Sequence, residues 1–413
     1  MSKSKKLWAI ILSLVLCCTG IEAFAETVTL NFWHHYSAQS KENETLMNDL
    51  IPKFESENPE IKVNAVSHEW AELHDKILVS SGSDSLPDVA RCDIAWIPEF
   101  QKMGILVPLS QEIQDFDEAS MELLDSAMST AKIADAYYAM PLNTNSKIMF
   151  YNKALLEKSG INVPKNMDEW VNAVRALSGN NDNGQQVWGW NEPGLSGWNI
   201  CPFIWSFGGS LTDEKCTKAS GYINSEKTVK AIETFTTLVK EGAITGFNSG
   251  DIPMTDGFGT SRYAMLLEGP WKIAELAGSY PEMEYGVAPI PEGEGGSISV
   301  LGGEDIAMFK SANKEAAWKF IKFMTSEYAQ EAMAKCGQIP VNKQALQSET
   351  VLNAPYAPFI DAIKNAKARP TVAAWSEMDN ELINTMNSII NNGKDVKEAL
   401  DELAVKFDKL LME

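Results

Sequence analysis

The chain has 413 residues, a formal net charge of −21 at pH 7 and 45% hydrophobic residues. A chain this acidic is a poor ligand for nucleic acid or anionic membrane surfaces, because both carry the same sign of charge. The apolar content is enough for sizeable cores, so the composition also excludes a disordered acidic polymer.

The first 25 residues are typical of an export signal. A basic start with three lysines precedes an apolar run over residues 7–18, and Ala23-Phe24-Ala25 has the small-x-small pattern of a cleavage site. The run is too short for a bilayer span, which needs about 20 residues. We therefore predict a signal peptide over 1–25 and an exported, periplasmic chain. The alternative is a lipoprotein anchored through Cys17 or Cys18, although Leu16 is bulkier than the residue usual before such a cysteine.

Strands and helices alternate along the rest of the chain. The patterns predict strands at 30–33, 61–66, 88–94, 140–151 and 263–267, and helices at 41–58, 68–80, 97–103, 153–159, 168–177, 226–242, 314–335 and 377–411, the last with a break at 391–393. This alternation predicts an α/β fold with mostly parallel sheets. The length after export, 413 − 25 = 388 residues, predicts two domains or one bilobal unit.

The segment Tyr263–Trp271 is the most informative single stretch. An apolar run is followed by Glu268, a Gly-Pro turn and Trp271, which predicts a carboxylate and an indole ring together at the end of a strand. A carboxylate accepts hydrogen bonds from hydroxyls, and an indole face covers C–H groups. A sugar ring offers both surfaces. The alternative is a tryptophan that only fills the core.

Motifs for catalysis, metals and cofactors are missing from the sequence. His68 and His74 are six residues apart, whereas two ligands on one helical face need a spacing of four. No nucleophile elbow, phosphate-binding loop or dinucleotide fingerprint occurs. We therefore expect no cofactor and no metal. The residue types alone do not exclude a glycosidase, which needs only a pair of catalytic carboxylates.

Four cysteines follow the predicted signal: Cys92, Cys201, Cys216 and Cys336. A disulfide between Cys201 and Cys216 would close a short loop in an oxidising compartment. Free buried thiols are the alternative.

Several phrases in a fixed order resemble the bacterial extracellular solute-binding proteins, family 1, of ABC sugar importers. They are Leu30-Asn-Phe-Trp33, Pro87-Asp-Val89 with Asp93-Ile-Ala-Trp96, Pro141 to Lys153, Glu268-Gly-Pro-Trp271, Leu301-Gly-Gly303 and Gly337 to Val341. Members that bind maltose, maltooligosaccharides and arabinogalactan oligomers are the most similar.

The resemblance implies a two-lobed periplasmic-binding-protein fold, with a hinge that the chain crosses several times and a ligand cleft between the lobes. We expect crossings near 141–145, 285–289 and 325–329. The N-terminal lobe would then combine 26–142 with 286–326, and the C-terminal lobe 143–285 with 327–413.

The resemblance also implies ligand contacts from the first lobe. His35 and Tyr36 match polar contacts after the first strand, with a hydrogen-bonded surface loop as the alternative. Asp93 matches a carboxylate that grips sugar hydroxyls, with a helix N-cap as the alternative, and Trp96 of the same phrase is a further expected ligand contact. Asn145 stands where relatives often have an acid. Gly303 would bring the backbone close to the ligand, and Glu304 replaces a tryptophan found in several relatives.

The second lobe would supply most of the aromatic contacts. The positions that match the family, with Glu268 from the segment above, are Glu192, Trp198, Glu268, Trp271, Arg369 and Trp375.

Together these features predict an exported, non-enzymatic carbohydrate-binding protein that delivers an oligosaccharide, such as a maltooligosaccharide, to an ABC importer. Its partners would be the sugar and the membrane permease subunits, with no nucleic acid, and we expect a monomer. The alternatives are a binder of a non-sugar solute, such as a polyol, glycerophosphodiester or peptide, and a glycoside hydrolase.

Overall fold

The computed structural model describes residues 27–38, 40–83, 85–310, 313–353 and 355–412. The predicted signal peptide and the two cysteines of the lipoprotein alternative lie outside these residues. In the described part of the chain, no helix combines the length and the apolar character that a membrane span requires.

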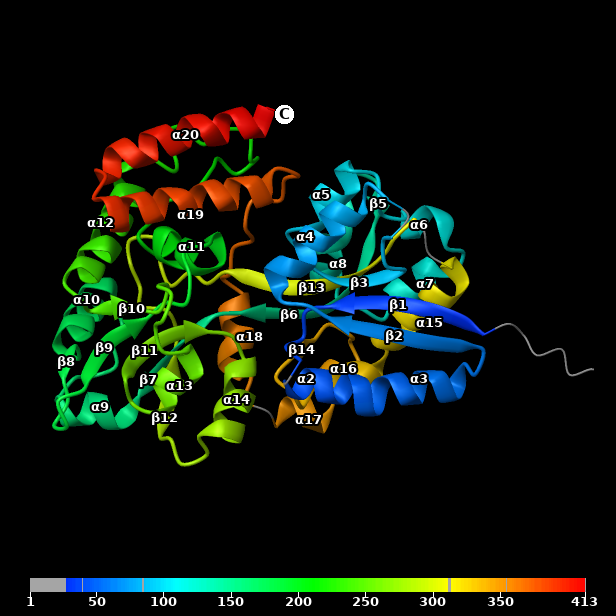
Figure 1. Ribbon diagram of the computed structural model, residues 1–413, viewed down its shortest axis with the longest axis horizontal. Helices are drawn as coiled ribbons and strands as arrows, with labels where there is room; N and C mark the ends of the chain where they lie inside the picture. Colours follow the sequence, from blue (N-terminus) through cyan, green and yellow to red (C-terminus); the bar gives the residue numbers. More distant parts are fainter. Residues whose placement is uncertain (1–26, 39, 84, 311–312, 354, 413) are drawn as a thin grey trace, which may run out of the picture.

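Two mixed β-sheets, one in each lobe, organise the molecule (Figure 1). The sheet of the first lobe has the order β14-β6-β13-β3-β1-β2. Its strands are β1 (Val28–His34), β2 (Ile61–Ser67), β3 (Val89–Asp93), β6 (Ala139–Ser146), β13 (Leu301–Met308) and β14 (Ile339–Pro340). The first three are parallel to one another, whereas β13 runs antiparallel to both β3 and β6.

The sheet of the second lobe has the order β10-β9-β11-β7-β12. Its strands are β7 (Ile148–Asn152), β9 (Gln186–Asn191), β10 (Ile244–Thr245), β11 (Tyr263–Glu268) and β12 (Tyr285–Ala288), and β8 (Gly179–Asn180) pairs with β9. A small hairpin of β4 (Lys132–Ile133) and β5 (Ala136–Tyr137) stands apart. Antiparallel pairs occur in both main sheets, so the sheets are less parallel than the sequence predicted.

Helices cover both sheets. Those of the first lobe are α2 (Lys41–Thr45), η1 (Leu46–Leu50), α3 (Ile51–Glu57), α4 (Trp70–Ser80), α5 (Ile97–Lys102), α6 (Leu109–Glu112), α7 (Phe116–Ser120), α8 (Asp125–Met128), η2 (Ser129–Ala131), α15 (Lys314–Met324), α16 (Glu327–Ala334), η3 (Ala345–Gln347) and α17 (Glu349–Leu352). Those of the second lobe are α9 (Lys153–Lys158), α10 (Met167–Ala176), α11 (Gly197–Ser206), α12 (Glu226–Lys240), α13 (Met254–Gly259), α14 (Trp271–Ser279), α18 (Ala357–Ile363), α19 (Trp375–Asn392) and α20 (Val396–Met412).

The segment α2–η1–α3 shows how local sequence sets an element that reaches the cleft. The Ser40 hydroxyl accepts the Asn43 backbone N–H at 3.2 Å and so caps the helix start. Leu46, Leu50 and Phe54 are fully buried on one face, and the helix ends at Glu57, with Asn58 as its C-cap before Pro59. The Ser40 cap places the first turn of α2 at the edge of the cleft.

Each lobe has its own apolar core. Phe32 and Met140 of the first sheet pack with Phe54 and Phe320 of its helices. In the second lobe, Trp190 of β9 packs with helix residues that include Trp170, Phe203 and Leu400. Two separate cores make each lobe a unit that can move as a body about the chain between them.

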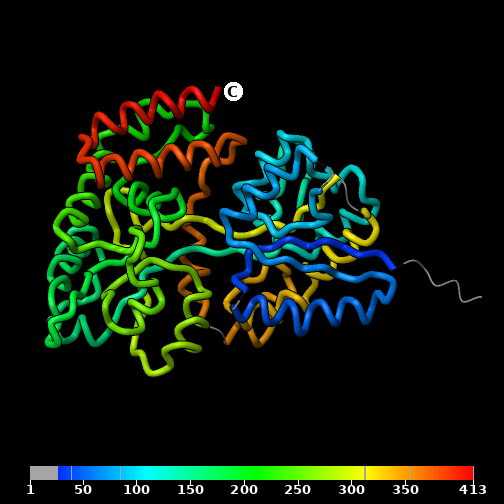
Figure 2. Tube along the Cα trace, in the orientation of Figure 1, coloured from blue at the N-terminus to red at the C-terminus, as the bar shows by residue number. Residues whose placement is uncertain are grey.

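The chain crosses between the lobes at three places (Figure 2). Lys147 separates β6 of the first sheet from β7 of the second. Residues 289–300 lead from β12 back to β13, and residues 341–356 lead from β14 to α18. The side chain of Phe359 on α18 packs against the second-lobe core residue Phe150.

The lobe boundaries expected from the sequence are wrong at these crossings, each of which comes later in the chain than expected. Residues 286–300 belong with the second lobe, because Ile290 and Val300 lie in its core. Residues 327–341 belong with the first lobe, because Met333 and Val341 lie in that core. Residues 143–146 complete β6 of the first sheet.

Of the two possibilities for Cys201 and Cys216, the structure shows free thiols and not a disulfide, since the four cysteines of the described residues are all unpaired. Cys201 is fully buried within α11, in the core of the second lobe. Cys216 lies in a partly exposed turn, where its Sγ accepts the Thr212 hydroxyl at 3.6 Å.

Candidate functional site

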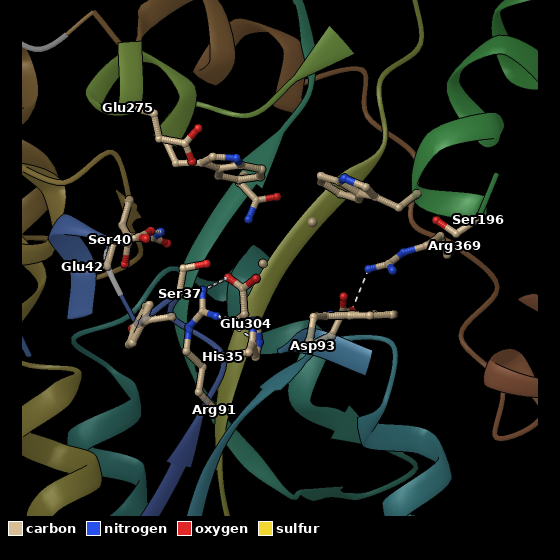
Figure 3. Close-up of a pocket in the computed structure, with 18 residues that line it drawn as sticks. His35, Ser37, Ser40, Glu42, Arg91, Asp93, Ser196, Glu275, Glu304 and Arg369 are labelled. Atoms are coloured by element: carbon tan, nitrogen blue, oxygen red, sulfur yellow. Dashed lines mark hydrogen bonds and ion pairs between the residues drawn. The ribbon is translucent and has the colours of Figure 1, made fainter. Parts of the chain in front are cut away.

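A cavity of about 330 Å³ lies between the two lobes. The first lobe contributes His35, Tyr36, Ser37, Ser40, Glu42, Trp70, Arg91, Asp93, Asn145, Gly302, Gly303, Glu304 and Gln338, and the second contributes Ser196, Trp198, Trp271, Glu275 and Arg369. Figure 3 shows charged side chains of both lobes pointing into this space. Its volume is in the range of small-molecule sites.

Two tryptophans form an aromatic wall on the second-lobe side. Trp198 is at the start of α11 and Trp271 at the start of α14, and their ring centroids are 6.4 Å apart with 25° between the planes. A Cβ on Gly269 would lie 2.2 Å from the Trp271 ring, and one on Gly302 would lie 2.6 Å from the Trp198 ring. These glycines therefore leave the space that the two indoles occupy.

A charged wall on the first-lobe side is centred on Arg91. Its Nη2 lies 2.8 Å from Oε2 of Glu304, and its Nη1 lies 2.8 Å from Nδ1 of His35. The guanidinium carbon also lies 4.2 Å from the centre of the Tyr36 ring. Burial lowers the pKa of His35 well below its usual value, with help from the charge of Arg91, so the imidazole is neutral here.

Strand geometry explains why these groups meet. Arg91 and Asp93 are two residues apart on β3, so their side chains point to the same face of the sheet. Glu304 of β13 stands opposite Asp93 in the antiparallel register. Burial raises the pKa of the Glu304 carboxyl, against the opposing effect of Arg91.

An ion pair joins the lobes across the cavity. Arg369 Nη2 of the second lobe lies 2.7 Å from Asp93 Oδ1 of the first (Figure 3), and both side chains are nearly buried. Asp93 Oδ1 also accepts the Ala95 backbone N–H at 2.8 Å. Asp93 thus lines the cavity and braces the turn before α5, but it does not cap that helix, whose N-cap position is Trp96 and has no side-chain capping hydrogen bond.

A second contact between the lobes lies beside the cavity. The Ser376 hydroxyl at the start of α19 donates to Glu99 Oε2 of α5 at 2.5 Å, and Glu99 Oε2 also lies 2.8 Å from Nε2 of His74. Hydrogen bonding to His74 and Ser376 lowers the pKa of Glu99, although burial opposes the shift. Both contacts hold the lobes together in this conformation.

Three buried polar atoms of the cavity wall lack a hydrogen-bond partner among the described residues. They are Oδ1 of Asn145, Nε of Arg91 and Nε of Arg369. Buried polar groups are normally satisfied, because an unmade hydrogen bond costs about 1–3 kcal/mol. One acceptor and two donors in the residues of the cavity wall are therefore left unpaired by the described residues.

Nine of the residues expected from the sequence line the cavity: His35, Tyr36, Asp93, Asn145, Trp198, Trp271, Gly303, Glu304 and Arg369. Four others do not. Trp96 and Trp375 are each 2% exposed and pack in the cores of the first and second lobe. Glu192 is fully buried, 3.9 Å from Lys147 Nζ, and burial raises its pKa to about 8. Glu268 accepts the Gly269 N–H at 2.9 Å and braces the turn.

Several residues that line the cavity were not predicted from the sequence, among them Arg91 and Trp70. Arg91 is a charged residue inside the otherwise apolar part of β3, and this isolated charge was a usable signal. Trp70 is 40% exposed at the start of α4. Nothing in its sequence context distinguishes it from a core tryptophan.

Two lobes joined by three chain crossings, with a solute-sized cavity between them, are the arrangement of binding proteins that close around a ligand by a hinge. The model of the bacterial extracellular solute-binding protein family matches residues 37–331, and the chain belongs to this family. The family predicted from the sequence is thus confirmed.

Individual relatives agree with this assignment. A putative binding protein of Brucella abortus is 27% identical over 376 residues, which cover 87% of this chain and 88% of that protein. The diacetylchitobiose-binding protein of Streptomyces coelicolor is 24% identical, covering 88% and 86% of the two chains. The GacH receptor of Streptomyces glaucescens, solved unliganded and with acarbose, superposes with a TM-score of 0.83 at 25% identity, over 94% of this chain and 99% of that one. The predicted two-lobed α/β fold is confirmed.

Proposed function

We propose that this protein captures a carbohydrate, in particular an oligosaccharide, in the cleft between its lobes and delivers it to an ABC importer. The observation that carries the proposal is the pairing of an aromatic wall, Trp198 and Trp271, with a charged wall around Arg91, Asp93 and Glu304. A sugar ring has C–H patches for the first wall and hydroxyls for the second.

The contacts supply enough free energy for useful affinity. A hydrogen bond to a charged group contributes about 1.5–3 kcal/mol, and apolar burial contributes about 25 cal/mol per Å². A micromolar ligand requires only about 8 kcal/mol. Several hydrogen bonds and one stacked ring reach this value after the costs of ordering the ligand.

Because the site is divided between the lobes, the conformation of the protein depends on whether a ligand is bound. A solute in the cavity contacts both walls only when the lobes are closed, so binding shifts the population toward the closed form. A permease that docks on the closed form would then receive loaded molecules in preference to empty ones. Export through the signal peptide at 1–25 would place the protein in the periplasm, where we expect it as a monomer.

A non-sugar anion, such as a glycerophosphodiester, fits the site less well. Both guanidinium groups of the wall are already engaged, Arg91 with Glu304 and Arg369 with Asp93. A phosphate would have to displace a carboxylate from its partner, with loss of a buried ion pair.

The proposal is tested by isothermal titration calorimetry of the mature protein against glucose, glucosamine, N-acetylglucosamine, maltose, maltotriose, cellobiose, chitobiose and diacetylchitobiose. We expect at least one of these sugars to bind with micromolar or lower Kd. Failure of every sugar to bind would overturn the proposed function.

The same protein, incubated with maltotriose and analysed for shorter products, tests the hydrolase alternative. We expect no release of products. Sustained turnover would show that the cleft is an active site.

A further inference from the structure

One end of the cavity is built around Glu42. This residue lies in the first turn of α2, and its carboxylate faces the cavity beside Ser37 and Ser40 (Figure 3). The side-chain amide of Gln338 donates a hydrogen bond to Glu42 Oε1. None of the ion pairs described above neutralises the charge of this carboxylate.

A count of charges shows that Glu42 is in excess. The cavity is lined by four carboxylates, Glu42, Asp93, Glu275 and Glu304, and by two guanidinium groups. Each arginine forms an ion pair with another of these acids, and Glu275 pairs with Lys272 at 2.5 Å. No ion pair among the described residues includes Glu42. The neutral His35 adds no positive charge.

The surroundings of Glu42 disfavour an isolated negative charge. Burial raises the pKa of its carboxyl, and the influence of Arg91 only partly offsets this effect. Arg91 contacts Glu304 at 2.8 Å, and its charge also acts on Glu42. One cation therefore serves two partly buried carboxylates at this end of the cavity.

A ligand that fills the cavity would remove still more water from Glu42. Dehydration of a carboxylate is costly unless a cation faces it. A neutral hydroxyl supplies a hydrogen bond but no charge, whereas an ammonium group supplies both. The free acceptor Oδ1 of Asn145 also favours a ligand rich in donors.

From this arrangement we infer that the sugar taken up by this protein carries a protonated amine, which Glu42 receives at its end of the cavity. The ligand class is then amino sugars and their oligomers, ahead of neutral or acidic sugars. This inference rests on the proposed sugar-binding function and specifies its substrate.

The test uses sugars that differ only at C2. Glucose, glucosamine and N-acetylglucosamine form one matched set, and cellobiose, chitobiose and diacetylchitobiose form a second. Maltose and maltotriose test sugar binding itself. At pH 7 we expect the amine-bearing member of at least one set to bind at least tenfold more tightly than its hydroxyl and acetylated counterparts.

The outcomes separate this inference from the proposed function. If a neutral or acetylated sugar binds as tightly as the amine, or if only maltose or maltotriose binds, the protein is a sugar binder but the amine assignment is wrong. If no sugar binds, the proposed function fails and the inference falls with it.

A pair of variants tests whether Glu42 is the residue that receives the amine of the sugar. Glu42→Gln keeps the shape and a hydrogen-bond acceptor but removes the charge, so we expect the tenfold preference for the amine to be lost while affinity for the hydroxyl counterpart changes less than threefold. Glu44→Gln is the matched control, because Glu44 lies on the same helix but is exposed and outside the cavity wall. An equal loss for amine and hydroxyl sugars in Glu42→Gln would show that Glu42 only accepts a hydroxyl, and would overturn the inference.

Discussion

The two walls of the cleft differ in chemistry and in construction. The first-lobe wall is charged and preorganised: Arg91, Glu304 and Asp93 come from neighbouring strands whose register fixes their positions. The second-lobe wall is aromatic, and Trp198 and Trp271 stand at the starts of two helices. The strands would orient hydroxyls, and the indoles would add apolar contact area. Neither wall alone offers a sugar ring both surfaces, so affinity should depend on closure.

The largest effect is expected from the aromatic wall. Trp271→Ala should weaken the tightest-binding sugar about 100-fold, since loss of one buried indole face removes roughly 2–3 kcal/mol. The sugar-induced change in intrinsic fluorescence should disappear while the circular dichroism spectrum is unchanged. Trp375→Phe is the control: that residue is in the core, so its variant should lower the Tm and leave Kd unchanged. Unchanged affinity in Trp271→Ala would assign Trp271 to the core instead.

The charged wall and the bridge between the lobes are tested together by Asp93→Asn. The change weakens the pair with Arg369, which spans the cleft at 2.7 Å, and removes a charged acceptor for hydroxyls. We expect Kd to rise at least tenfold, about 1.4 kcal/mol. A change in Tm without a change in Kd would mean that Asp93 only braces its turn.

The lobes share one feature, a fully buried carboxyl with a raised pKa. Burial raises the pKa of Asp305 in the first lobe from 3.8 to about 8, and that of Glu192 in the second from 4.5 to about 8. Between these values the folded protein keeps a proton that the unfolded chain has lost. The free energy of unfolding contributed by each group therefore falls as the pH rises from about 4 to about 8.

Calorimetric Tm values from pH 5 to 8 test this sign. Asp305→Asn and Glu192→Gln should each make the decline of Tm with pH shallower, because each removes a linkage of about 1.4 kcal/mol per pH unit, up to about 4 kcal/mol in the free energy of unfolding over the range. Glu118→Gln, at an exposed position, is the control. Equal slopes in all four proteins would contradict the assignment.

A smaller effect is expected from the contact beside the cavity. Ser376→Ala removes the hydroxyl that donates to Glu99 across the lobes, a hydrogen bond with a net value of about 0.5–1.5 kcal/mol. Because Ser376 does not line the cavity, the variant should raise Kd about threefold for every sugar alike, through the closed population. Ser388→Ala on the same helix should have no effect. Selective loss of one sugar would mean that Ser376 touches the ligand.

Much of the fold could be predicted from the sequence, because caps, breaks and alternation act locally. The strand 61–66 and the helix 41–58 were placed to within a residue, and the break at Gly393 separates α19 from α20. The hinge crossings were harder. β6 is a continuous strand whose last residues reach the hinge, so no change of composition marks where one lobe ends.

The site was predictable only in part, because tertiary packing decides which of the matching residues face the cavity. Trp198 and Trp271 face the cavity while Trp96 and Trp375 are buried, yet all four match positions in the family pattern. Tertiary packing decides which indole is exposed, and a single sequence does not encode this locally. Arg91 carried a signal of its own, a charge in an apolar strand. The sugar contacts of the nine lining residues stay predictions until a ligand is seen.

The most direct measurement is a crystal structure of the protein with the tightest-binding sugar of the panel. The sugar should lie between the lobes, with a ring face against Trp198 or Trp271 and hydroxyls within hydrogen-bond distance of Asp93, Glu304 or Arg369. A sugar bound outside the cleft, or one that touches neither tryptophan, would contradict the division of the site into an aromatic and a charged wall.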